Sequence, residues 1–213
     1  MDNDDLFRRT AANRRRAADL LAGLTPEQWS TPTLCAEWTV RELAGHLIMP
    51  VEASIPRFLV ALVRAKGSGD RAVDLISRDL ARRGPDAMVA TLREKADSRF
   101  APPMIGAFGP MADSCIHLRD AARPLGSDVT APLDDWRIVL DFLVSPKAKH
   151  GFVPTGRLDG LHLRATDIDW RSGDGAEVVG PAEALALAMT GRPVALADLD
   201  GDGVAILRER ITA

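Results

Sequence analysis

The chain has 213 residues, 46% of them hydrophobic and 27% charged, which is enough apolar material for a folded core. The net charge of −3 excludes a basic surface of the kind that binds nucleic acid or anionic membranes, so we expect neither partner. Residues 1–10 begin with acids and no stretch is long and apolar enough to span a bilayer, which predicts a cytoplasmic protein. The two cysteines, Cys35 and Cys115, predict no disulfide framework.

The first half of the chain has the spacing of helices. Residues 3–23 place apolar side chains on one helical face, and a short helix is predicted to start at residues 25–28. Thr39 and Glu42 form a capping box, which predicts the start of a helix that carries His46 beside its apolar stripe. Pro50 lacks the amide that would bond the carbonyl of His46, so we expect a kink there before the helix resumes over 58–66.

Four more segments continue the helical pattern, at residues 72–82, 85–98, 111–126 and 132–149. Gly and Pro residues separate them, and the connections are short. This arrangement predicts a four-helix bundle as the first domain, residues 1–149.

The pattern changes after residue 150. Leu161, Leu163 and Ala165 alternate with polar residues, as in a half-buried strand. A turn is predicted at 169–175, a second strand at 178–179 and a helix at 181–190, whereas 203–211 fits a strand or a helix. We therefore predict an α+β protein with domains 1–149 and 150–213.

The segment 111–126 carries a possible metal site. Asp113 and His117 are four residues apart and share one helical face, and Asp120 falls on that same face. The chain has only three other histidines, and His46, which also lies in a strong helical pattern, is the natural third ligand. Two imidazoles and a carboxylate would leave one position of a catalytic metal open. The alternative is a solvated Asp113 with a hydrogen-bonded core histidine at His117. Cys115 falls on the opposite face and is predicted to be buried in the core.

A second motif matches a calcium-binding loop. Asp198, Asp200, Asp202, Gly203 and Glu209 occupy every defined position of the EF-hand pattern. An EF-hand also needs a helix that runs directly into the loop, and a Gly and a Pro interrupt the chain just before it. We therefore interpret these acids as turn-forming residues.

Three stretches resemble one family. The sequence PTLCAEWTVRELAGHL at 32–47, the Asp113-to-Gly126 pattern D-x-x-x-H-x-x-D-x-x-R-x-x-G, and the tail after residue 163 are similar to the mycothiol-dependent maleylpyruvate isomerase family, whose metal-binding domain is DinB-like. The resemblance covers most of the chain. It implies that His46, Asp113 and His117 bind a divalent metal, commonly zinc, and that the acids of the tail belong to a family pattern. The family also has Glu where this chain has Asp113.

The resemblance also implies a function. Mycothiol would be the thiol cosubstrate, and a bound cation would hold it as a thiolate that attacks a small electrophile or organic acid, in an isomerase or an S-transferase. An arginine suits the carboxylate of such a substrate, and Arg208 and Arg210 in the tail are the candidates. Asp120 either hydrogen-bonds a ligand histidine or pairs with a neighbouring arginine, Arg119 or Arg123. A non-enzymatic metal-binding or regulatory protein on the same fold is the alternative.

Overall fold

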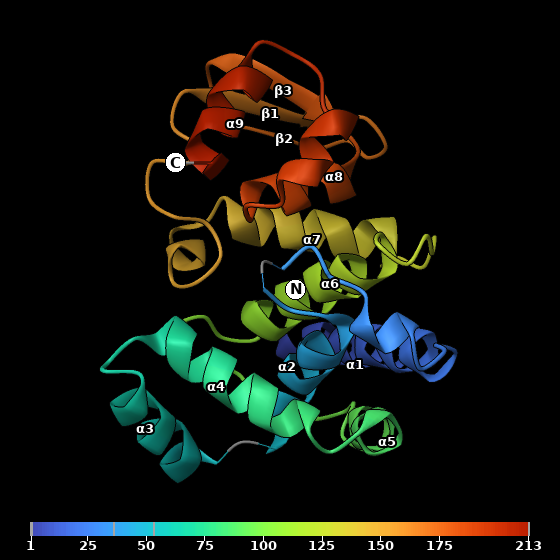
Figure 1. The fold of residues 1–213 in the computed structure, drawn as a ribbon. Helices are drawn as coiled ribbons and strands as arrows, with labels where there is room; N and C mark the ends of the chain where they lie inside the picture. Colours follow the sequence, from blue (N-terminus) through green and yellow to red (C-terminus); the bar gives the residue numbers. More distant parts are fainter. Residues whose placement is uncertain (1, 36, 53, 213) are drawn as a thin grey trace. The chain divides into compact units, whose positions relative to one another are not determined.

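The computed structural model describes residues 2–35, 37–52 and 54–212, and the chain forms two compact units (Figure 1). The first unit comprises Met1–Ala101 and His117–Thr130, and the second comprises Pro102–Ile116 and Ala131–Ala213. These units follow the contacts of the folded chain, and the division into domains 1–149 and 150–213 stays a prediction.

The elements follow one another as helices first and a small sheet later. The helices of the first part are α1 (Asn3–Ala22), η1 (Gln28–Ser30), α2 (Val40–Glu52), α3 (Ile55–Arg64), α4 (Gly69–Ala81), α5 (Pro85–Glu94) and α6 (Phe108–Ala122). The later elements are α7 (Leu133–Leu143), η2 (Pro146–Lys149), β1 (Leu161–Ala165), β2 (Arg171–Ser172), β3 (Ala176–Gly180), α8 (Ala182–Met189), η3 (Pro193–Asp198) and α9 (Gly203–Thr212). The predicted α+β class is confirmed.

Helices α1, α2, α4 and α5 pack on one another in the first unit, where α2 lies against α4 and α5, and α1 lies against α5. Their shared core contains large apolar side chains that are almost fully buried, among them Ile48, Leu80, Met88 and Leu92. Burying each such side chain contributes about 1.5–3 kcal/mol, so this core fixes the position of α2 relative to α4.

The predicted capping box starts helix α2. The backbone amide of Thr39 donates to the Glu42 carboxylate at 2.9 Å, and the Thr39 hydroxyl contacts the same oxygen. Burial alone would raise the pKa of Glu42, but the hydrogen bonds from Thr39 hold it below its ordinary value.

The end of α2 differs in detail from the predicted kink. The helix continues through Pro50 to Glu52, and a separate helix, α3, begins at Ile55 with Ser54 as its N-cap. At the C-terminal end of α2 the Glu52 carboxylate forms ion pairs with Arg83 and Lys95. These pairs hold the pKa of Glu52 below its ordinary value.

The second unit contains a three-stranded sheet among the residues that the structure describes, with strand order β2-β1-β3. β1 pairs with β3 in parallel, from Leu161 opposite Ala176 to Ala165 opposite Gly180, and with β2 in antiparallel register. Helix α8 packs against α7, and α8 and α9 both contact the sheet (Figure 1).

Two segments of this unit show what the sequence pattern alone did not decide. The stretch 169–175, predicted as a turn, contains the two-residue strand β2, which forms because Ala165 bonds Trp170 across a short hairpin. The stretch 203–211, which fitted a strand or a helix, is the helix α9. In both cases the pairing or packing partner decides the structure, and local sequence does not show it.

No helix in the described part of the chain has the length and apolarity that crossing a membrane requires.

Candidate metal centre

Helix α6 carries the three polar residues that the sequence placed on one face. Pro110 is accommodated near its N-terminal end, where a missing amide is tolerated, so the helix begins at Phe108 and not after Pro110. Asp113 and His117 are half-buried, and Asp120 is fully buried. Cys115 is also fully buried, which agrees with its predicted place in the core.

His46 on α2 lies beside His117 of α6. The two imidazole centroids are 4.7 Å apart and meet edge to face, and His46 is only 8% exposed. One ligand atom each from His46, Asp113 and His117 lies within 4.8 Å of the other two. Asp113 precedes His117 by one turn of the same continuous helix. The structure therefore brings together the three residues that the sequence singled out.

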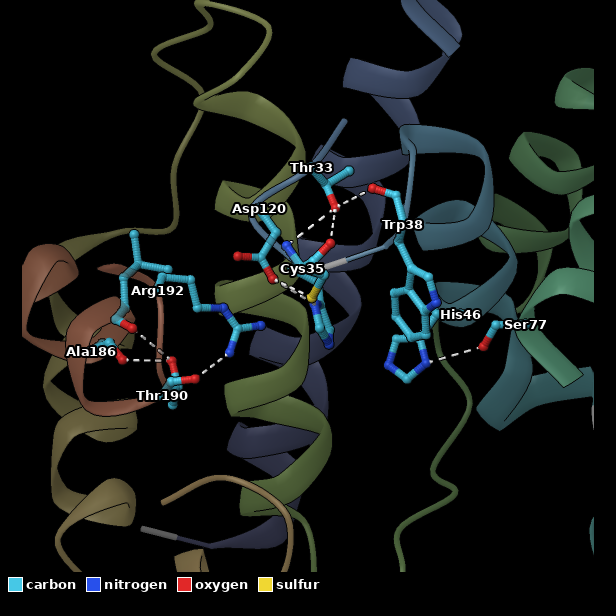
Figure 2. Close-up of polar contacts among 11 residues, drawn as sticks. Thr33, Cys35, Trp38, His46, Ser77, Asp120, Ala186, Thr190 and Arg192 are labelled. Carbon is cyan, nitrogen blue, oxygen red and sulfur yellow. Dashed lines mark hydrogen bonds and ion pairs between the residues drawn. The ribbon is translucent and has the colours of Figure 1, made fainter. Parts of the chain in front are cut away.

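Gly45 explains how His46 reaches this position. A Cβ atom at Gly45 would lie 2.2 Å from the carbonyl oxygen of Ser77 and 2.9 Å from the amide nitrogen of Ala81. Only glycine allows the backbones of α2 and α4 to approach so closely. This close contact places His46 next to Ser77, and its imidazole Nδ1 lies 3.5 Å from the Ser77 hydroxyl (Figure 2).

The hydrogen bonds at Nδ1 determine which nitrogen of each imidazole can bind a cation. The Ser77 hydroxyl donates its proton to the carbonyl of Val73 at 2.8 Å, so it accepts from Nδ1 of His46. Nδ1 of His117 donates to Asp120 Oδ2 at 2.8 Å. In both imidazoles the proton is then on Nδ1 and the lone pair is on Nε2, which is the usual tautomer of a metal-ligating histidine.

Asp120 contacts His117, which corresponds to the first of the two roles considered from the sequence. Its carboxylate is 0% exposed and accepts the His117 proton at short distance. Arg119, one of the proposed ion-pair partners, donates to the carbonyls of Ser127 and Val129. Asp120 therefore has the geometry of a residue that orients a ligand histidine.

Two neighbours of the cluster were not identified from residue chemistry, although both lie in the Cys-x-x-Trp motif. The Cys35 thiol donates to Asp120 Oδ2 at 3.2 Å and lies 3.7 Å from His117 Nδ1. The Trp38 ring lies 5.0 Å from the His46 ring and 6.5 Å from the His117 ring. Its indole N–H donates to Asp74 at 2.7 Å, which fixes the ring as an aromatic wall beside the histidines.

The loop that carries Cys35 is held in place by backbone bonds. The Thr33 amide donates to the carbonyl of Trp38 at 2.9 Å, and the Leu34 amide donates to the carbonyl of Asp120 at 3.1 Å. The Thr33 hydroxyl lies within hydrogen-bond distance of three backbone atoms of the loop (Figure 2). Cys35 is therefore positioned against the C-terminal part of α6 by a defined loop.

The predicted arginines of the tail have other contacts in the second unit. Arg210 donates to the carbonyls of Arg157 and Asp159, at 3.0 and 2.7 Å, and Arg208 is exposed on α9. A different pair is notable there. Burial, followed by the like charge of Arg192, lowers the pKa of the Arg157 guanidinium, and its buried Nε lacks a hydrogen-bond partner within the described residues. Such a nitrogen is a donor suited to an anion.

Within the described residues, the acids of the tail are in neither of the two groups that could hold a metal ion. Among the described residues, the groups whose ligand atoms are close enough to hold an ion are His46, Asp113 and His117, and Cys35, His117 and Asp120. Asp198, at the end of η3, and Asp200, which pairs with Val179, belong to neither group. Their interpretation as turn-forming residues stays a prediction.

The fold and the histidine–carboxylate cluster define an α+β protein with a candidate metal centre. Residues 10–101 match the family model described as the mycothiol maleylpyruvate isomerase N-terminal domain. The chain is also similar to the crystal structure of the mycothiol-dependent maleylpyruvate isomerase, with a TM-score of 0.64 and 15% identity, over 95% of this chain and 93% of that one. A crystal structure of a histidine-to-alanine mutant of the mycothiol-dependent maleylpyruvate isomerase gives a TM-score of 0.65 and 14% identity over the same shares.

Among curated proteins, a comparison by sequence finds no match. The family model agrees, for residues 10–101, with the resemblance inferred from the sequence, and 95% of the chain has the fold of the isomerase structures.

Proposed function

We propose that the chain is a metal-dependent enzyme that uses a low-molecular-weight thiol, mycothiol, to attack an electrophilic small molecule. The reaction is either a maleylpyruvate isomerase-like isomerisation or a transfer of the thiol to the electrophile. The observation that carries the proposal is the group formed by His46, Asp113 and His117, whose ligand atoms lie within 4.8 Å of one another. The family match and the fold of the isomerase structures support it.

The donor set fits a divalent cation, and zinc in particular. Two imidazoles with Nε2 lone pairs and one carboxylate are the three protein ligands of many catalytic zinc sites, in which a fourth position takes water or substrate. A cation bound there would lower the pKa of a thiol, so that the thiolate form is present at neutral pH.

The surrounding residues hold these ligands in place. The Ser77 hydroxyl and the buried Asp120 carboxylate fix the two imidazoles, each through its Nδ1 proton. The negative charge of Asp120 makes His117 a stronger electron-pair donor. The Trp38 ring lies near both imidazoles, at 5.0 Å from the His46 ring and 6.5 Å from the His117 ring, and its aromatic surface would lower the access of water.

The two candidate reactions begin with the same bond. In an isomerisation, the thiolate adds to a conjugated cis double bond, the electron pair moves onto the carbonyl, the new single bond rotates, and the thiolate leaves unchanged. In a transfer, the sulfur–carbon bond stays and the electrophile takes up a proton or loses its leaving group. Either reaction develops negative charge on the substrate, which a cationic donor stabilises.

An arginine is expected to bind the carboxylate of an organic acid substrate. Arg208 and Arg210 are the candidates from the sequence. Arg157, beside Arg192, is a further candidate, because its buried Nε lacks a hydrogen-bond partner within the described residues. Changing each arginine to glutamine distinguishes these candidates. Substitution of the residue that binds the carboxylate should raise KM for an acid substrate and leave the metal content unchanged.

Metal content tests the proposal first. Elemental analysis of the native protein should give one tightly bound divalent ion per chain, lost in His46→Ala and His117→Ala and retained in His162→Ala. His162, which lies on β1, is the matched control, because its Nδ1 is hydrogen-bonded to the carbonyl of Gly173 and the residue is in neither candidate metal-binding group. Undiminished metal in both site variants would refute the proposed centre.

Thiol binding and turnover test the second step. Adding mycothiol to the cobalt-substituted protein should produce a sulfur-to-cobalt band in the near ultraviolet, and Asp113→Ala should lose the band together with the ion. Turnover with maleylpyruvate or with electrophile panels then distinguishes an isomerase from a transferase. Metal binding without a thiol signal and without turnover would support the non-enzymatic alternative on the same fold.

A further inference from the structure

A second group of possible ligands shares His117 with the first and consists of Cys35, His117 and Asp120. Cys35 Sγ lies 3.2 Å from Asp120 Oδ2 and 3.7 Å from His117 Nδ1, and these two last atoms are 2.8 Å apart (Figure 2). All three residues are in the first unit, and Asp120 is fully buried while Cys35 is partly exposed. The group contains a thiol, an imidazole and a carboxylate, three of the usual donors to zinc.

The spacing of these donors is close to that of a metal site. Tetrahedral zinc with ordinary bond lengths separates sulfur from nitrogen or oxygen by about 3.6 Å and nitrogen from oxygen by about 3.4 Å. The three observed distances of 3.2, 3.7 and 2.8 Å differ from these by about 0.6 Å or less. Small side-chain rotations would therefore convert a hydrogen-bonded triad into a coordinating one.

We propose that Cys35, His117 Nδ1 and Asp120 form a second cation site, selective for thiophilic ions such as Zn²⁺, Cd²⁺ or Cu⁺. Filling the site removes the Cys35 S–H proton and the His117 Nδ1 proton, both of which are released to solvent. Sulfur gives the site its preference, because thiolate ligands favour soft ions over Mg²⁺ or Ca²⁺.

Occupation of this site would oppose the function proposed above. The Nδ1 proton that His117 donates to Asp120 is lost, and with it the hydrogen bond that fixes the ring as an Nε2 donor. A thiophilic ion in excess should therefore inhibit turnover, whereas the first equivalent should support it. The second site is independent of the proposed function except that it shares His117.

Cadmium titration tests the inference directly. Without added thiol, wild-type protein should bind two Cd²⁺ per chain, and the ion bound at Cys35 should give a sulfur-to-cadmium absorption in the ultraviolet. Cys35→Ala should bind one ion and lose the absorption, while Cys115→Ala, the matched control with the buried thiol removed, should behave as wild type. Retention of the first ion by Cys35→Ala also shows that this variant is folded.

Asp113→Ala separates this inference from the proposed catalytic centre. It removes a ligand of the first site only, so it should keep the sulfur-to-cadmium absorption with a single bound ion. The inference is overturned if wild type shows no such absorption at saturating Cd²⁺, or if Cys35→Ala retains it. Because Cys35 would also produce a sulfur-to-cobalt band, the mycothiol experiment should be repeated in the Cys35→Ala variant.

Discussion

Asp120→Asn should weaken metal binding at the His46, Asp113 and His117 centre without unfolding the protein. The Asp120 carboxylate is fully buried and accepts the His117 Nδ1 proton at 2.8 Å. Asparagine has the same shape and still offers a carbonyl oxygen, but it lacks the charge that increases the basicity of the ring. The change therefore isolates the electrostatic part of the contact.

The magnitude follows from the role of such carboxylates. Removing the residue that orients a metal-ligating histidine usually costs about 10- to 100-fold in affinity. Because asparagine keeps one hydrogen bond, we expect the lower end, about 10-fold, which is about 1.4 kcal/mol. Asp120→Ala removes the hydrogen bond as well and should cost more, about 100-fold.

The assay is competition for Zn²⁺ with a chelator of known affinity, at one equivalent of metal so that only the tighter site fills. Asp141→Asn is the matched control, because this carboxylate also accepts from a ring N–H, that of Trp170, at 2.8 Å. The control should keep wild-type zinc affinity. Zinc affinity of Asp120→Asn equal to that of wild type would refute the argument that Asp120 acts on a metal ligand through His117.

Three further predictions concern other parts of the chain. Gly45→Ala should lower the free energy of unfolding by about 1–3 kcal/mol, measured by urea unfolding, and should weaken zinc binding in the competition assay, because the added Cβ meets the α4 backbone. Gly23→Ala, whose Cβ has no contact shorter than 3.6 Å, is the control and should change neither quantity. Glu52→Gln should destabilise the protein at neutral pH, because the Glu52 carboxylate stabilises the fold while it is charged. In unfolding experiments at a series of pH values, the difference in stability from wild type should vanish as the pH falls through the lowered folded-state pKa of Glu52. Calorimetric titration with calcium near millimolar should give no heat of binding, and a stoichiometric signal that Asp198→Ala abolishes would contradict this.

The sequence by itself determined the class of fold and the residues of the candidate metal centre. Helical spacing and the capping box at Thr39 set the helices, because these signals depend on side chains within one or two turns. The four-residue spacing placed Asp113 and His117 on one face of α6 for the same reason. The scarcity of histidines then left His46 as the partner, and the structure brings it to His117.

Only the tertiary structure decided which contacts tune that ligand set. Cys35 and Asp120 are 85 positions apart in sequence, and their hydrogen bond depends on a loop held against α6. Ser77 reaches His46 because Gly45 allows α2 and α4 to approach each other closely. The distance between these two helices cannot be predicted from local sequence patterns. Strand β2 likewise forms only because β1 offers it a partner. Local residue patterns specify helices and faces, whereas contacts between distant segments depend on how those faces pack.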